Sequence, residues 1–127
     1  MRRIRITAGA TMATAILNDS PTADALWDAL PIEARANTWG DEIYFSIPLQ
    51  MDESDDAHQV VEIGDLGYWP PGHAFCIFFG RTPASRGNEA RAASPVNPLG
   101  HVEGDPTIFT TVPDGAVIVL ERITSEG

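Results

Sequence analysis

The sequence predicts a mainly β fold: a closed antiparallel barrel of about eight strands, with one main helix and one short helix. Many short segments alternate apolar and polar residues, which is the period of a strand. The 11 glycines and 10 prolines indicate many turns, and a single long segment has helical spacing. We expect residues 1–127 to form one domain. Closure is expected because it removes exposed strand edges.

The first two strands are predicted to form a hairpin. Ile4 and Ile6 alternate with arginines, and residues 11–17 also have period two. The short stretch 8–10, Ala-Gly-Ala, suits a tight connection between them.

The main helix is predicted to follow this hairpin. Ser20 is a good N-cap, Pro21 suits the first helical position, and Pro31 ends the segment. Its apolar residues recur at helical spacing: Ala23, Leu26, Trp27 and Leu30. Such an amphipathic helix can cover one side or one end of a sheet.

The middle of the chain returns to period two. Residues 32–37 and 43–47 are predicted to form a second hairpin around a turn at 39–42. Residues 74–79, Ala-Phe-Cys-Ile-Phe-Phe, are the most apolar stretch. Both faces of this stretch are apolar, so we expect a central strand that is buried on both sides.

The carboxy-terminal part begins with a predicted long loop. Residues 80–98 are rich in Pro, Gly, Ser, Asn and Arg and show no apolar periodicity. Strand character resumes at 99–102 and again at 117–121, and Asp105-Pro106 can start the short helix, through Phe109. We expect residues 125–127 to fray.

Charge excludes several classes of partner. The formal net charge is −10, and the chain contains eight arginines and no lysine. Such a chain cannot neutralise a run of phosphates, so we expect neither nucleic-acid binding nor attraction to an anionic membrane.

No apolar run is long enough to span a membrane, and one cysteine cannot form an intramolecular disulfide. We therefore expect a cytoplasmic protein, whose oligomeric state the sequence does not indicate.

The reactive side chains do not form a recognisable catalytic or metal motif. His58, His73, His101 and Cys76 lack the short spacings of metal sites, so no metal or cofactor is predicted. Cys76 lies inside the apolar run and is interpreted as an inert core thiol. No Gly-x-Ser-x-Gly motif is present. We predict no catalytic residue from these patterns.

Recognition is better supported than catalysis. Trp39 and Trp69 lie beside Gly and Pro turns and are candidates for the mouth of a pocket. Arg81, Arg86 and Arg91 concentrate three cations in the predicted long loop. A solvated loop is the simpler interpretation, and a clamp for a carboxylate or a peptide carbonyl is the alternative.

Four stretches of the sequence resemble a known family. They are residues 37–45 (Asn-Thr-Trp-Gly-Asp-Glu-Ile-Tyr-Phe), 64–72 (Gly-Asp-Leu-Gly-Tyr-Trp-Pro-Pro-Gly), 74–80 (Ala-Phe-Cys-Ile-Phe-Phe-Gly) with 82–85 (Thr-Pro-Ala-Ser), and 94–97 (Ser-Pro-Val-Asn). These motifs are similar to those of small bacterial and archaeal cyclophilin-like proteins, a domain family of unknown function. The likeness extends from about Arg3 to Val119, and it implies a cyclophilin-like barrel.

The resemblance leaves two functional hypotheses. The first is a non-catalytic module that binds a small molecule or a peptide in an aromatic groove. Its candidate residues are Trp39, Glu42, Tyr44, Phe79, Thr82 and Asn97. For Phe79, a position in the core is the competing interpretation.

The second hypothesis is a peptidyl-prolyl isomerase that uses a non-standard arginine. True cyclophilins carry Arg-x4-Phe-x2-Gln, and this sequence lacks it: Arg35 is followed five residues later by Gly40, and Arg81 by Arg86. Arg35 or Arg81 would then have to donate to the substrate carbonyl. The missing motif favours the binding module and leaves enzymatic activity open.

Overall fold

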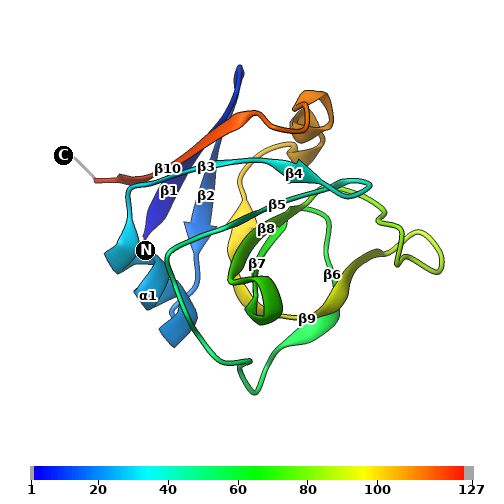
Figure 1. Cartoon of the computed structure of the whole chain (residues 1–127), viewed down its shortest axis with the longest axis horizontal. Coiled ribbons are helices and arrows are strands. Elements are labelled where there is room, and N and C mark those ends of the chain that lie inside the picture. Colours follow the sequence, from blue (N-terminus) through cyan, green and yellow to red (C-terminus); the bar gives the residue numbers. More distant parts are fainter. Residues whose placement is uncertain (1, 125–127) are drawn as a thin grey trace.

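The computed structural model describes residues 2–124 and contains ten strands, one α-helix and two short 3-10 helices within them (Figure 1). The elements are β1 (Arg3–Ala8), β2 (Thr11–Leu17), α1 (Pro21–Ala29), β3 (Ile32–Arg35), β4 (Asn37–Thr38), β5 (Glu42–Ser46), β6 (His58–Val61), β7 (Asp65–Trp69), η1 (Pro70–Gly72), β8 (Ala74–Phe78), β9 (Ala90–Val102), η2 (Pro106–Thr111) and β10 (Val117–Ile123). The mainly β prediction is confirmed.

The sheet is antiparallel, but its hydrogen bonding is not closed. The strand order is β3-β10-β1-β2-β9-β7-β8-β5-β4, with β6 paired to β9. Within residues 2–124, no ladder joins β3 to β4, so the expected closed barrel is not confirmed. The two end strands are successive parts of one extended segment, separated only by Ala36. Covalent continuity, instead of hydrogen bonding, links the two ends of the sheet.

The amino-terminal predictions are confirmed. β1 and β2 form a hairpin in which Ile6 lies opposite Ala13. Helix α1 begins where expected, because the Ser20 Oγ accepts a hydrogen bond from the Ala23 amide at 3.1 Å. Leu26 is fully buried beneath the helix, which therefore covers part of the main core.

The predicted second hairpin is largely wrong. Strand β3 pairs with β10, so that Ile32 lies opposite Leu120. Only β4 pairs with β5, where Asn37 lies opposite Tyr44. A period of two shows that a segment is extended but does not identify its partner, which is why the sequence pattern misassigned this pairing.

The predicted long loop at 80–98 is partly wrong, because its second half belongs to strand β9. Ala90 and Ala92 are buried, but their small side chains produce no apolar periodicity. Pro95 lies where the ladder with β6 shifts register, and Pro98 lies beside a register shift in the ladder with β7. Prolines are tolerated at such irregularities because no regular ladder bond is lost.

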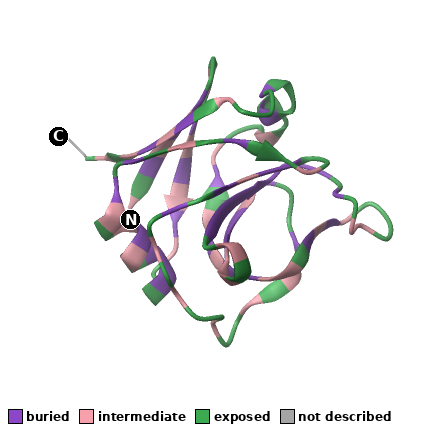
Figure 2. Cartoon of the chain, in the orientation of Figure 1, coloured by how far each residue is buried: buried purple, intermediate pink, exposed green. Residues whose placement is uncertain are grey.

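Two hydrophobic clusters lie on opposite faces of β8. In Figure 2 this strand has the colour of buried residues. Phe75 and Ile77 point into the main cluster. Ala74, Cys76 and Phe78 point into a smaller one. All five residues are buried, which confirms the prediction of a central strand covered on both sides.

The last elements follow the prediction. The short helix is the 3-10 helix η2, capped by Asp105 and anchored by buried Phe109, and β10 forms the final strand. The expected fraying at 125–127 lies outside the described residues. None of the helices in residues 2–124 is long and apolar enough to cross a membrane.

Candidate functional site

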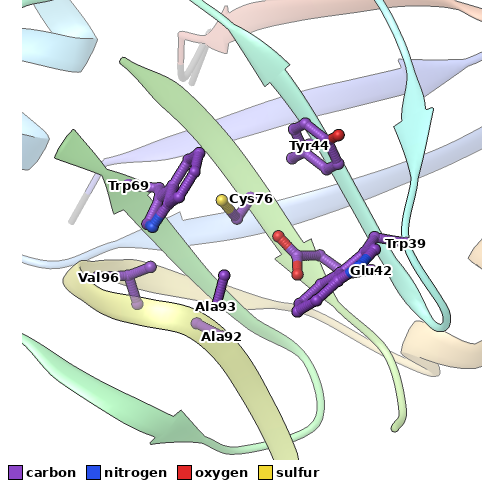
Figure 3. A pocket seen from close by; sticks show the side chains of 8 residues that line it. All are labelled: Trp39, Glu42, Tyr44, Trp69, Cys76, Ala92, Ala93 and Val96. Atoms are coloured by element: carbon purple, nitrogen blue, oxygen red, sulfur yellow. The ribbon is translucent and has the colours of Figure 1, made fainter. Parts of the chain in front are cut away.

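A pocket of about 260 Å³ opens beside the smaller cluster, on the face of β8 that points away from the main core (Figure 3). Its walls come from β5, β7, β8, β9 and the turn that precedes β5. The lining residues are Trp39, Glu42, Tyr44, Trp69, Cys76, Ala92, Ala93 and Val96.

The pairing of β5 with β8 brings the central lining residues together. Tyr44 lies opposite Cys76 in the ladder, and Glu42 is two residues away on the same face of β5. The intervening residue, Ile43, points into the main core. Strand alternation therefore places a carboxyl, a phenol and a thiol on one surface.

One wall is held by the turn between β4 and β5. The Trp39 amide donates to the Glu42 carbonyl at 2.9 Å, and Gly40 has a φ of +61°. A Cβ at Gly40 would lie 2.9 Å from the Arg81 carbonyl oxygen. Glycine thus permits both the left-handed backbone and the close packing that position the Trp39 indole.

The opposite wall is the first part of β9, which passes close over β7. A Cβ on Gly67 would lie 2.7 Å from Val96 Cγ2, so a glycine is needed at this crossing. On the same strand as Gly67, the Trp69 indole Nε1 donates to Ser94 Oγ at 2.7 Å. This hydrogen bond fixes the ring that closes the side of the pocket.

We expect Ser94→Ala to destabilise the protein by about 1 kcal/mol, since it removes the acceptor of a half-buried indole. The tryptophan emission spectrum should also change, because Trp69 loses its fixed orientation. Urea unfolding and emission spectra measure both effects. Ser54→Ala, which removes a hydroxyl bonded to Asp56, is the control. Unchanged stability and emission in Ser94→Ala would contradict this role.

Glu42 is the polar centre of the pocket. Its side chain belongs to a residue that is only 5% exposed, and its Oε1 has no hydrogen-bond partner among residues 2–124. Burial raises the pKa of Glu42 from 4.5 to about 7, and the adjacent Cys76 thiol lowers it by a smaller amount. Near neutral pH, both the charged and the neutral carboxyl are therefore populated.

Cys76 is buried, as expected for a core thiol, but it also borders the pocket. Burial, with a further contribution from Glu42, raises the pKa of the Cys76 thiol well above its ordinary value. The thiol stays protonated and is not an activated nucleophile. Its place at the pocket follows from its pairing with β5, which composition alone does not reveal.

The structure brings together three of the six predicted site residues, Trp39, Glu42 and Tyr44. Phe79 does not line this pocket; it packs in the main core with its ring centroid 6.1 Å from that of Phe109. Trp69, which the sequence suggested for the mouth of a pocket, is among the residues that line this one.

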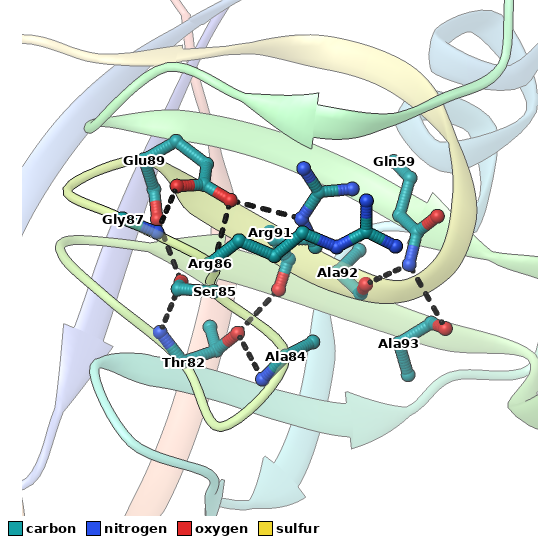
Figure 4. Close-up of polar contacts among 10 residues, drawn as sticks. All are labelled: Gln59, Thr82, Ala84, Ser85, Arg86, Gly87, Glu89, Arg91, Ala92 and Ala93. Carbon is teal, nitrogen blue, oxygen red and sulfur yellow. Dashed lines mark hydrogen bonds and ion pairs between the residues drawn. The ribbon is translucent and has the colours of Figure 1, made fainter.

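Thr82 holds the loop between β8 and β9 (Figure 4). Its hydroxyl donates to the Arg91 carbonyl and accepts from the Ala84 amide at 3.2 Å. Its own amide donates to Ser85 Oγ at 2.9 Å. Thr82 does not line the pocket, and its hydrogen bonds shape the loop that precedes the β9 wall.

The cations of this loop do not reach the pocket. The Glu89 carboxylate accepts hydrogen bonds from Arg91 Nε at 2.9 Å and from the amides of Arg86 and Gly87 (Figure 4). These bonds lower the pKa of Glu89 to about 2. Arg91 is thus committed to an ion pair, and the alternative of an arginine clamp gains no support.

Asn97 stabilises the fold and does not contribute to the pocket. It is fully buried and accepts a hydrogen bond from the Ser54 amide at 2.8 Å. Its Nδ2 donates to the Asp52 carbonyl at 2.9 Å and to Thr22 Oγ1 at 3.2 Å. These bonds connect β9, helix α1 and the segment between β5 and β6 that contains Asp52 and Ser54. Asn97 is not among the residues that line the pocket.

Metal ligands do not gather anywhere in the described part of the chain. Between residues 2 and 124, no group of three or more His, Cys, Asp or Glu side chains is arranged to hold a metal ion. Cys76 and Glu42 are the two ligand-type side chains of the pocket, and two ligands fall short of the sets that hold structural or catalytic zinc.

Comparisons with known proteins indicate the same family as the sequence motifs. The cyclophilin-like family model matches residues 2–121. The solution structure of a hypothetical protein from Archaeoglobus fulgidus is similar, with 39% sequence identity and a TM-score of 0.82, covering 96% of this chain and 95% of that one. No curated protein matches. The chain therefore belongs to the cyclophilin-like family.

Proposed function

We propose that this protein is a non-catalytic module that binds a small molecule or a short peptide segment in the pocket beside β8. The observation that carries this proposal is buried Glu42, which lines an otherwise mainly apolar cavity and whose Oε1 has no hydrogen-bond partner among residues 2–124. A buried polar atom without a partner is costly to the folded protein. A ligand that supplies a hydrogen bond there would remove this cost.

The remaining lining suits a ligand with apolar surface. Trp39, Tyr44 and Trp69 provide aromatic area, and the alanines of β9 leave space opposite them. At about 30 Å³ per water molecule, 260 Å³ corresponds to about nine water molecules. A ligand portion with a similar number of non-hydrogen atoms would fill it.

The isomerase alternative requires a cationic donor at the groove. No arginine is among the residues that line the pocket, and Arg35 Nη1 donates to the Gly115 carbonyl at 3.1 Å. This arrangement favours binding over isomerisation. In a protease-coupled proline isomerisation assay, acceleration that vanished in Arg35→Ala or Arg81→Ala would overturn the proposal.

We expect Ala93→Phe to abolish binding of small apolar ligands, because Ala93 is an exposed residue at the pocket and a phenyl ring there would occupy the cavity. Benzyl alcohol is a suitable neutral probe, with chemical shifts of the tryptophan indoles as the readout. Ala10→Phe, at an exposed alanine in the β1–β2 turn, is the control and should bind like the wild type. Equal binding by both variants would refute this pocket as the site.

A further inference from the structure

We infer that the ligand of this pocket carries a protonated amine with at least one N–H, which donates to Glu42 and lies between the Trp39 and Trp69 indoles. This inference rests on the proposed binding function and names the chemical class of the ligand. Three features of the pocket support it: its charge, the free acceptor and the arrangement of its rings.

The charge of the pocket is uncompensated. Glu42 is buried, and the residues that line the cavity include no arginine and no histidine. The chain contains no lysine that might supply a counter-ion. An ionised carboxylate in a dry environment needs a positive partner. Since the protein does not place one there, the complementary charge has to come from the ligand.

The free acceptor adds a requirement for a hydrogen-bond donor. Oε1 of Glu42 has less than 1 Å² of exposed surface and no partner among residues 2–124. An ionised carboxylate only accepts hydrogen bonds. A quaternary ammonium ion has charge but no N–H, so it would leave this oxygen unpaired. A primary, secondary or tertiary ammonium group satisfies both requirements.

The aromatic rings suit a cation with an apolar substituent. In Figure 3, the Glu42 carboxylate lies between the Trp39 indole and Cys76, while Trp69 stands on the far side of Cys76. Indole faces attract cations, and they attract ammonium groups more strongly when water is excluded. The formal net charge of −10 also favours the approach of a cation over that of an anion.

The titratable groups that face Glu42 do not compete with a cation for it. Tyr44 on β5 and Cys76 on β8 are the other titratable residues of the lining, and β7 and β9 contribute none. The Cys76 thiol remains neutral because its pKa is raised. The raised pKa of Glu42, about 7, means that ammonium binding should strengthen as the pH rises through neutrality.

The decisive comparison uses two probes of equal size, benzylammonium and benzyl alcohol, titrated into the intact protein at pH 8 and followed by indole chemical shifts. We expect benzylammonium to bind at least tenfold more tightly than benzyl alcohol. Glu42→Gln should reduce the ratio of the two affinities at least tenfold, to about one, because the variant has no charge to distinguish the ammonium group from the hydroxyl. Glu33→Gln, at an exposed carboxylate on β3, should bind both probes like the wild type.

Two further probes refine the ligand class. Benzyltrimethylammonium should bind more weakly than benzylammonium, because it cannot donate to Oε1. N-acetyl-lysine methylamide presents an ammonium group from a peptide unit. Binding of this compound at least as tight as that of benzylammonium would support a peptide as the source of the amine, and weaker binding would support a free amine.

The outcomes separate the two proposals. If benzyl alcohol binds as tightly as benzylammonium, or Glu42→Gln keeps the preference, the amine inference is wrong and the binding module stands. Tighter binding of benzyltrimethylammonium would likewise overturn the N–H requirement. If neither benzyl probe shifts the Trp39 and Trp69 signals, the pocket is not a binding site for either, and both proposals fail.

Discussion

Glu42→Gln is expected to increase the free energy of unfolding by about 3 kcal/mol at pH 8, although the residue lies at the proposed binding site. The pKa of Glu42 is about 7 in the folded protein against 4.5 as its ordinary value. The folded state therefore binds this proton more tightly than the unfolded state. Wild-type stability should fall as the pH rises from about 4.5 to about 7 and then level off. At ~1.4 kcal/mol per pKa unit, the accumulated loss is about 3 kcal/mol.

Urea unfolding at pH 5 and pH 8 tests this prediction. At pH 5 the wild-type carboxyl is largely protonated when folded, so Glu42→Gln should change the stability little. At pH 8 the full difference should be present. Glu33→Gln, at an exposed carboxylate on β3, is the control and should change the stability by less than ~0.5 kcal/mol. A Glu42→Gln effect that is the same at both pH values would show that burial of the charge is not the cause.

Asn97→Ala is expected to lower the free energy of unfolding by about 3 kcal/mol. The substitution removes three hydrogen bonds and leaves the Ser54 amide and the Asp52 carbonyl without their partner. Each lost hydrogen bond costs ~0.5–1.5 kcal/mol, and the cavity left by the fully buried Asn97 side chain adds to this loss.

Urea unfolding measures the loss, and hydrogen exchange at the Ser54 amide should accelerate. Asn37→Ala is a suitable control, because Asn37 is exposed and its side chain makes one hydrogen bond, to the Tyr44 carbonyl at 3.2 Å. We expect that variant to lose less than ~1 kcal/mol. A loss of similar size in both variants would contradict the structural role of Asn97.

Local signals in the sequence predicted the elements that depend on neighbouring residues. The N-cap at Ser20 and the alternation of residues 4–6 and 11–17 are of this kind. The partner of β3 and the closure of the sheet depend on residues far apart in the chain. The apolar–polar alternation of β3 is compatible with pairing to β10 or to β5, so the packing of the whole fold decides which strand becomes its partner.

Only the part of the candidate site that is formed by residues close in the sequence could be predicted. Trp39, Glu42 and Tyr44 lie within six residues of one another, and strand alternation alone puts two of them on one face. Ala92 and Val96 belong to the opposite wall, which forms only when β9 passes over Gly67. Small apolar residues among prolines and serines carry no local signal for such a crossing.

Strand β9 takes part in two sets of ladders. Its residues 90–96, which include the lining residues Ala92, Ala93 and Val96, pair with β6, and residues 97–102 pair with β7 and β2 in the main sheet. The far side of the cavity is thus an extension of the central ladder. Widening the cavity would require peeling that ladder apart. The pocket therefore has its shape before a ligand binds. The entropic cost of ordering its walls belongs to folding and is not added to the free energy of binding.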